Sequence, residues 1–208
     1  MLQMKESDFE ILRLIYRFRF CLGRHIKELI GYKSLRASDR RLKAILEAGY
    51  IERKKYLFGI PYLYTLSHKG RMLLGVNHKK ENIRIDRILH DIHVLDTVIY
   101  FVKKYNLALN NIISEKELYS LSGFTVRVHH PDFIIDYKEK KLAVEVELTP
   151  KNKEILEKNI KANFINYDSQ TWISNNIKVL NLLAKLKDTY SNVVIINLGE
   201  VLDYIRDK

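Results

Sequence analysis

Three carboxylates stand in two short apolar segments of the stretch HHPDFIIDYKEKKLAVEVELTPKNK, residues 129–153. Asp132 begins the first segment, and Glu145 and Glu147 alternate with apolar residues in the second. Hard cations such as Mg²⁺ and Mn²⁺ prefer carboxylate oxygens, and a bound divalent ion can activate water and polarise a substrate oxygen. The stretch therefore has the residue types of a metal-dependent hydrolytic site.

Both segments are predicted to be strands of one hairpin. They are rich in β-formers, and KEKK between them suits a turn. A loop that closes symmetrically about Glu139–Lys140 would place Asp132 opposite Glu147 and Ile134 opposite Glu145, with all three acids on one face. Opposed like charges destabilise a sheet by roughly 0.2–1 kcal/mol per pair, and a bound divalent cation reverses that sign.

A solvent-facing sheet is the alternative interpretation of the same spacing. The acids would then pair with neighbouring lysines: Lys138, Lys140, Lys141 and Lys153. Pro131 lacks an N–H to donate and so marks a strand start or a bend in either case.

The pattern P-D, short strand, turn and A-V-E-V-E-L resembles the signature of PD-(D/E)xK nucleases. The resemblance implies a restriction-endonuclease-like domain, a mixed sheet flanked by helices, in which Asp132, Glu145 and Glu147 bind Mg²⁺ or Mn²⁺ and act on a phosphodiester. It also implies one further acid from an upstream element, where Glu115 and Glu117 lie, and Glu115 is the predicted one. The flanks match the family's α-β-β-β-α-β order, with a long helix before the hairpin and, after it, a helix, a strand, a helix and a strand at residues 151–165, 169–174, 177–190 and 192–198.

One position departs from that signature. Glu147 stands where the family pattern has lysine, which gives E-x-E in place of E-x-K. Two replacements for the missing lysine are possible. One is a third acid together with metal-bound water, and the other is Lys151 or Lys153 at the start of the next helix.

The formal net charge of +11 lies in the first part of the chain. Residues 1–80 contain 18 Lys and Arg against 7 Asp and Glu, whereas residues 81–208 contain 18 of each. A surplus confined to one module indicates a surface for a polyanion, and a merely solvated basic face is the alternative.

The basic module is predicted to contain three helices and a hairpin, at residues 7–20, 23–32, 34–50 and 50–70. This order, with L-x-x-x-G-x-I after the third helix, resembles a winged helix-turn-helix over residues 5–76. The resemblance implies that the third helix enters the DNA major groove and that the hairpin is a wing. The predicted DNA contacts are Arg36, Ser38, Arg40, Arg41 and Lys43 on the helix and Arg53, Lys54 and Lys55 on the wing. A winged helix that binds protein is the alternative.

A long helix is predicted over residues 81–106, where apolar residues keep helical spacing without Pro or Gly. His90 and His93 share one face of it, but no third metal ligand lies at a recognisable spacing, so packed histidines are favoured. We therefore expect two domains, a DNA-binding domain at residues 1–78 and a nuclease-like domain at residues 79–208, with residues 79–105 as the packing helix.

The whole arrangement resembles the replication-relaxation family of mobile-element proteins, which is related to conjugative relaxases of the MOBC class. The resemblance implies a DNA-binding, metal-dependent nicking endonuclease that acts on double-stranded DNA of a plasmid or mobile element. Two alternatives remain: a non-catalytic replication or transfer initiator or transcriptional regulator with an inactive nuclease fold, and a winged-helix repressor with an unrelated effector domain.

The remaining composition indicates a cytoplasmic protein without membrane association. One cysteine, Cys21, excludes an internal disulfide, and the sequence contains no long uncharged apolar run. Homodimer formation and assembly with other replication or transfer proteins stay open.

Overall fold

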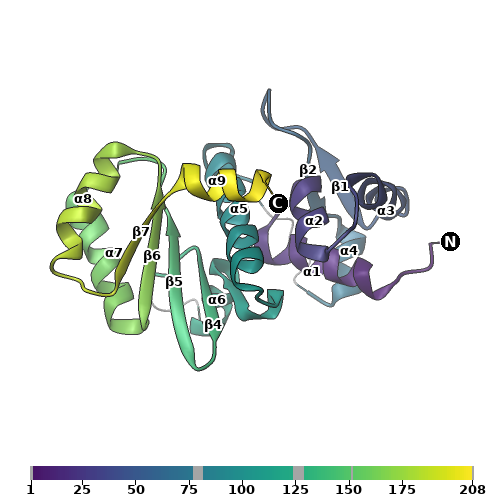
Figure 1. Cartoon of the computed structure of the whole chain (residues 1–208). Helices are drawn as coiled ribbons and strands as arrows, with labels where there is room; N and C mark the ends of the chain where they lie inside the picture. The colour runs from purple at the N-terminus through teal and green to yellow at the C-terminus, as the bar shows by residue number, and fades with distance from the viewer. Residues whose placement is uncertain (1, 77–81, 124–128, 151, 208) are drawn as a thin grey trace. The chain divides into compact units, whose positions relative to one another are not determined.

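The computed structural model describes residues 2–76, 82–123, 129–150 and 152–207, which form a mixed α and β architecture (Figure 1). The chain divides into two compact units, Met1–Leu95 and Asp96–Lys208. The division falls later than the expected boundary at residue 78. The reason is that Ile88 and Ile92 pack in a cluster with apolar residues of the first unit.

The first unit contains three helices, a two-stranded antiparallel hairpin and a fourth helix, in the predicted order. Its elements are α1 (Glu6–Phe18), α2 (Gly23–Ile30), α3 (Leu35–Glu47), β1 (Ile51–Lys54), β2 (Leu63–Leu66) and α4 (His68–Leu74). Ser34 caps α3 by accepting the N–H of Ala37 at 3.2 Å, and Gly31 ends α2 in the left-handed region at φ 79°. Local sequence signals thus set the ends of these two helices.

Apolar residues at helical spacing build the core of this unit. In α1, Ile11, Leu12 and Ile15 are inaccessible to solvent. In α3, Ile45 is inaccessible and Leu42 is 1% exposed. The periodicity that predicted the helices is the periodicity that buries one face of each.

Helix α5 (Ile88–Tyr105) begins later than predicted. A short 3₁₀ turn, Ile85–Arg87, precedes it, and Arg84 has an extended backbone at φ −79° and ψ 116°. The side chain of Arg84 also donates a hydrogen bond to the carboxylate of Asp86 at 2.5 Å. Side chains two residues apart do not face each other in a regular helix. In the described ranges, no helix has the length and apolarity needed to cross a bilayer.

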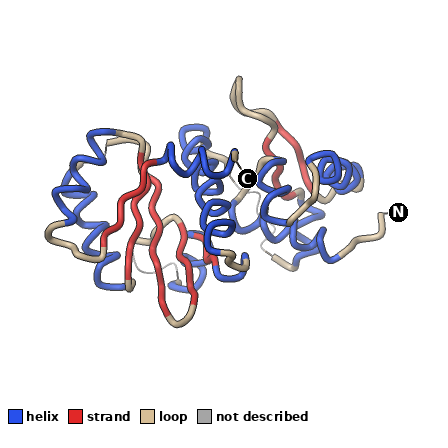
Figure 2. Tube along the Cα trace, in the orientation of Figure 1, coloured by secondary structure: helices blue, strands red, loops and turns tan. Residues whose placement is uncertain are grey.

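The second unit is built on a five-stranded sheet of order β3-β4-β5-β6-β7, with helices on both faces (Figure 2). β3, β4 and β5 run antiparallel, and β5, β6 and β7 run parallel, so the predicted mixed sheet is confirmed. Its strands are β3 (Ile112–Ser114), β4 (Phe133–Tyr137), β5 (Lys140–Val146), β6 (Ser169–Ser174) and β7 (Val193–Asn197). Its helices after α5 are α6 (Glu115–Ser122), α7 (Lys153–Asn166), α8 (Ile177–Lys187) and α9 (Leu198–Arg206).

The two faces of this sheet meet different helices. Trp172 of β6 packs in a cluster with Ile160 of α7 and Leu183 of α8. On the other face, the ring of Phe133 in β4 meets Phe101 of α5 edge to face at 6.2 Å. Helices therefore cover both faces of the sheet beside the ends of β4 and β5 that carry Phe133 and Glu145, whereas Asp136 near the turn stays half-exposed.

Candidate functional site

The β4–β5 hairpin has a register two residues away from the predicted one. Its turn consists of Lys138 and Glu139, both with positive φ (51° and 63°), and Phe133 lies opposite Val144. Asp132, just before Phe133, therefore lies across from Glu145 and not from Glu147, which corrects the prediction. A shift of two residues leaves the same side chains on each face, so the acids still share one face.

Glu145 is buried, with only 5% of the residue exposed. Nε2 of His129 lies 2.6 Å from its Oε1, and Asn163 of α7 donates to the same oxygen at 3.1 Å. Burial raises the pKa of Glu145; the hydrogen bond with His129 opposes this rise and the negative charge of Asp132 adds to it. The site therefore contains a buried carboxyl group whose charged form is disfavoured.

The two other hairpin acids are also built into the sheet. Oδ2 of Asp132 accepts the backbone N–H of Val146 at 2.8 Å, which ties the start of β4 to the end of β5. Glu147 is 4% exposed, and its N–H donates to the carbonyl of Ile173 at 2.8 Å. Burial of Glu145 and Glu147 contradicts the solvent-facing alternative for these two glutamates.

Glu115 was predicted to join the hairpin acids from an upstream element. Glu115 is the first residue of α6, and its N–H donates to the carbonyl of Asp132 at 2.9 Å. Burial and the charge of His129 lower the pKa of His130, and the charge of Glu115 opposes them. Glu115 is therefore near the start of β4.

Of the two lysines considered as substitutes, only Lys153 lies within the described residues. Lys153 is exposed at the first residue of α7, and no ion pair in the described part of the chain joins it to Glu145. Lys151 lies outside the described residues. The basic partner of Glu145 is instead His129, which comes from the residues just before β4.

Within the described part of the chain, a three-ligand metal cluster is not assembled. Among the described residues, no three His, Cys, Asp or Glu side chains are grouped to hold an ion. Of the predicted set of Asp132, Glu145 and Glu147, the register places Asp132 and Glu145 across from each other. His90 and His93 are likewise in no such group among the described residues. The Nδ1 atom of His90 lies 3.0 Å from a carboxylate oxygen of Asp91.

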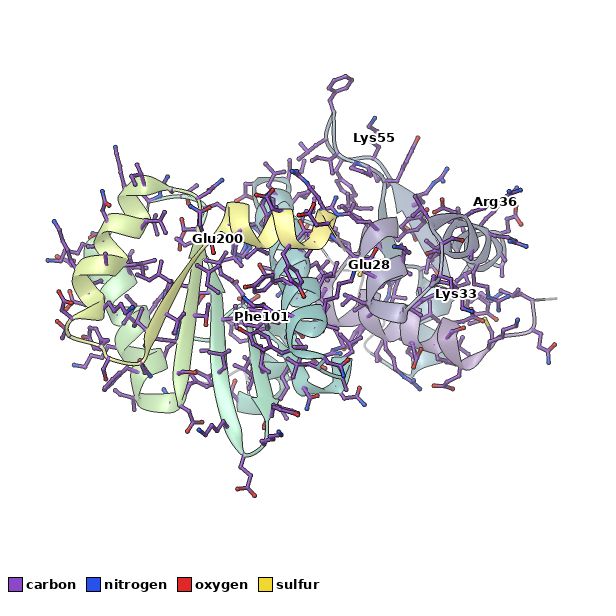
Figure 3. All side chains as sticks on the ribbon, in the orientation of Figure 1. Glu28, Lys33, Arg36, Lys55, Phe101 and Glu200 are labelled. Carbon is purple, nitrogen blue, oxygen red and sulfur yellow. The ribbon has the colours of Figure 1, made fainter. Side chains whose placement is uncertain are left out.

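The basic residues of α3 divide between solvent and core. Arg36, Arg40 and Lys43 are exposed, and together with Asp39 they line one shallow depression (Figure 3 shows Arg36). These three side chains present positive charge on one side of the helix.

Two residues predicted to contact DNA face inward instead. Ser38 is fully buried, because it lies on the core side of α3 near Leu42. Arg41 donates from Nε to the buried Asp8 at 2.6 Å and from Nη2 to the carbonyl of Gln3 at 3.0 Å. Burial would raise the pKa of Asp8, but the bonds from Arg41 and from the N–H of Lys5 outweigh burial and lower it. These roles are structural, which corrects the prediction.

The basic residues of the β1–β2 hairpin are all exposed, and each lies over an aromatic ring. The distances from the cation to the ring centroid are 4.5 Å for Arg53 over Tyr62, 5.0 Å for Lys54 over Tyr56 and 5.6 Å for Lys55 over Phe58. Lys55 extends from the ribbon into solvent (Figure 3). The hairpin thus carries exposed positive charges with aromatic rings among them.

Two residues of the acidic centre were missed from the sequence, His129 and Asn163. The pair His129–His130 beside Pro131–Asp132 was a usable signal, since histidine next to a catalytic-type acid often tunes it. Asn163 gave no signal, because an amide in the middle of a helix looks like any polar residue.

Comparison with known proteins finds no matching family model, no matching curated protein and no matching solved structure.

Proposed function

We propose that this protein binds double-stranded DNA through its first unit, acting as a winged helix-turn-helix. The observation that carries the proposal is the exposed positive surface formed by Arg36, Arg40 and Lys43 of α3. Helices of this kind enter the major groove, while flanking cations contact phosphates. Arg53, Lys54 and Lys55 extend the same charge along the hairpin and would follow the backbone as a wing.

Removal of three charges tests this proposal. The combined variant Arg36→Ala, Arg40→Ala, Lys43→Ala should bind a 30-bp duplex at least about 100-fold more weakly than the wild type in fluorescence anisotropy at low salt, because three phosphate contacts are lost. The matched control removes three exposed lysines of α7 and α8: Lys158, Lys161 and Lys178. Equal losses in both variants would point to net charge alone and refute a site on α3.

We further propose that the second unit is a PD-(D/E)xK nuclease-like domain that nicks the bound DNA. Support comes from the strand order, antiparallel through β5 and then parallel, and from Asp132 and Glu145 on neighbouring strands of one face. Mg²⁺ commonly takes only one or two carboxylates from a protein, with water and phosphate oxygens completing its shell. The pair Asp132 and Glu145 fits that demand, and these residues would hold the ion.

When bound, Mg²⁺ or Mn²⁺ would supply positive charge at the phosphodiester and lower the pKa of water. The chain's own residues would fix the geometry. Asn163 and His129 hold one oxygen of Glu145, and the N–H of Val146 holds one oxygen of Asp132. The acids would then meet the ion without rearranging, which is the condition for efficient charge stabilisation.

A supercoiled-plasmid assay tests nicking. We expect wild type with Mn²⁺ to give open circles and Glu145→Gln to give none. Asp136→Asn should act as wild type, because Asp136 is a half-exposed acid of the same hairpin that pairs with Lys141 at 4.0 Å. EDTA should stop nicking. If the wild type leaves the supercoiled plasmid intact with every metal ion tested, the proposed nicking activity is refuted.

A non-catalytic DNA-binding initiator or regulator is the second candidate. The observation that favours it is the E-x-E sequence at Glu145 and Glu147, with no three-ligand group in the described residues. Retained DNA binding together with absent nicking would establish it. In either case we propose that the protein works in the cytoplasm on plasmid or mobile-element DNA, in replication initiation or mobilisation.

A further inference from the structure

The loop at residues 55–62, which joins β1 to β2, carries a fully exposed aromatic ring. Phe58 has 100% of its surface exposed. Gly59, which follows it, has φ +77°, a left-handed conformation that turns the chain directly after the ring. The tip of the loop projects beyond the strands of the hairpin (Figure 1). The ring therefore stands at the far end of the hairpin.

The outward position of Phe58 follows from the way the loop is anchored. Three other apolar residues of the loop, Tyr56, Leu57 and Ile60, are half-buried. They pack against a cluster of buried residues: Phe20, Leu22, Leu63, Ile88 and Ile92. Since apolar residues on both sides of Phe58 are attached to the core, the loop holds its ring in water.

The surroundings of the ring indicate the kind of partner. Lys55 lies with its Nζ atom 5.6 Å from the ring centroid, and Arg53 and Lys54 precede it on the same hairpin. An apolar ring among cations fits a partner whose apolar groups lie between anionic ones. Stacked bases flanked by phosphates have this chemistry.

We propose that Phe58 inserts between stacked bases of duplex DNA while the cations of the hairpin hold the flanking phosphates. Apolar wedges of this kind unstack a base step and bend the duplex. This inference rests on the proposed DNA binding and adds a role to it: the wing would deform the DNA as well as position the protein. Phe58 would contribute to affinity without adding to the salt dependence, because the ring neutralises no phosphate.

The test uses the full chain, a 30-bp mixed-sequence duplex with dyes at both ends, and three variants. Phe58→Ala should bind about tenfold more weakly than wild type, with the same salt slope, and should lose the rise in energy transfer that reports bending. Phe58→Trp should bind as wild type, and its added fluorescence should fall on saturation with DNA, since the native Trp172 is fully buried. Met72→Ala, which truncates another exposed apolar residue of the unit, should match wild type.

Three results would overturn insertion. The first is Phe58→Ala binding and bending DNA as wild type does, which leaves the proposed DNA binding intact. The second is unchanged emission from Phe58→Trp on saturation. The third is a loss of binding to phosphatidylserine vesicles in Phe58→Ala while DNA affinity stays equal, which would assign the ring to a lipid surface. Wild type that binds no duplex at low salt would overturn both proposals together.

Discussion

Two buried carboxylates, Asp8 and Glu145, have opposite pKa directions because their partners differ. Asp8 lies against the guanidinium of Arg41, whose bonds and charge outweigh burial. Glu145 has a histidine and an amide as partners and a like charge across the strand, so burial dominates. One carboxylate stabilises its unit in the charged form, whereas the other costs stability when charged.

Arg41→Met should destabilise the first unit by about 3 kcal/mol at pH 7, because it leaves Asp8 buried and charged without its partner. The folded-state pKa of Asp8 is lowered, so the stabilisation is present above the ordinary value of 3.8 and is lost as the pH falls through the lower folded value. Urea denaturation at pH 7 and pH 3 checks this: the difference between the two proteins should shrink at pH 3. An equal difference at both values would mean that Arg41 acts by packing alone.

Glu145→Gln should keep or raise stability at pH 8 in EDTA, by about 1 kcal/mol, because the neutral amide removes a disfavoured buried charge. Glu145→Ala should lower stability by about 2 kcal/mol, because Asn163 and His129 lose their shared acceptor. Thermal denaturation of the two variants beside wild type measures both effects. A Glu145→Gln variant less stable than Glu145→Ala would contradict the raised pKa.

At the scale of elements, periodicity and turn residues predicted most helices and strands of both units, and the structure confirms them. The β4–β5 register escaped prediction because two-residue hairpin turns with positive φ usually contain Asn-Gly or Asp-Gly, and here they contain Lys138 and Glu139. Arg41 escaped because its partner Asp8 is a tertiary contact, 33 residues away in sequence. Ser38 lies four residues before Leu42, on the buried face of α3, so helical spacing could have excluded it.

Gly70 in α4 shows how one contact between elements outweighs local propensity. A Cβ atom there would lie 2.1 Å from the carbonyl oxygen of Tyr50. Gly70→Ala should therefore destabilise the protein by about 3 kcal/mol although alanine favours helices. At Gly23, the first residue of α2, an added Cβ meets its neighbours at 3.7 Å or more, so Gly23→Ala should be neutral or slightly stabilising. Equal urea midpoints for the two variants would contradict this packing.

At the scale of the whole molecule, the positive charge and the acids of the β4–β5 hairpin lie in different parts of the chain. The surplus of positive charge lies in residues 1–80, within the first unit, whereas Glu145 and Glu147, the buried hairpin acids, lie in the second. Sequence alone showed this separation, because counting charges needs no contacts. It could not show the boundary inside α5, which depends on where Ile88 and Ile92 pack.

The most direct test of the account is the salt dependence of DNA affinity in the full-length chain. The logarithm of the association constant should fall steeply with the logarithm of salt concentration, and Arg40→Ala with Lys43→Ala should reduce that slope by about 2, since each lost phosphate contact removes about one unit. Arg41→Met should leave the slope unchanged, because Arg41 bonds Asp8. Binding that ignores salt, or an equal slope in the double variant, would contradict a DNA-binding surface on α3.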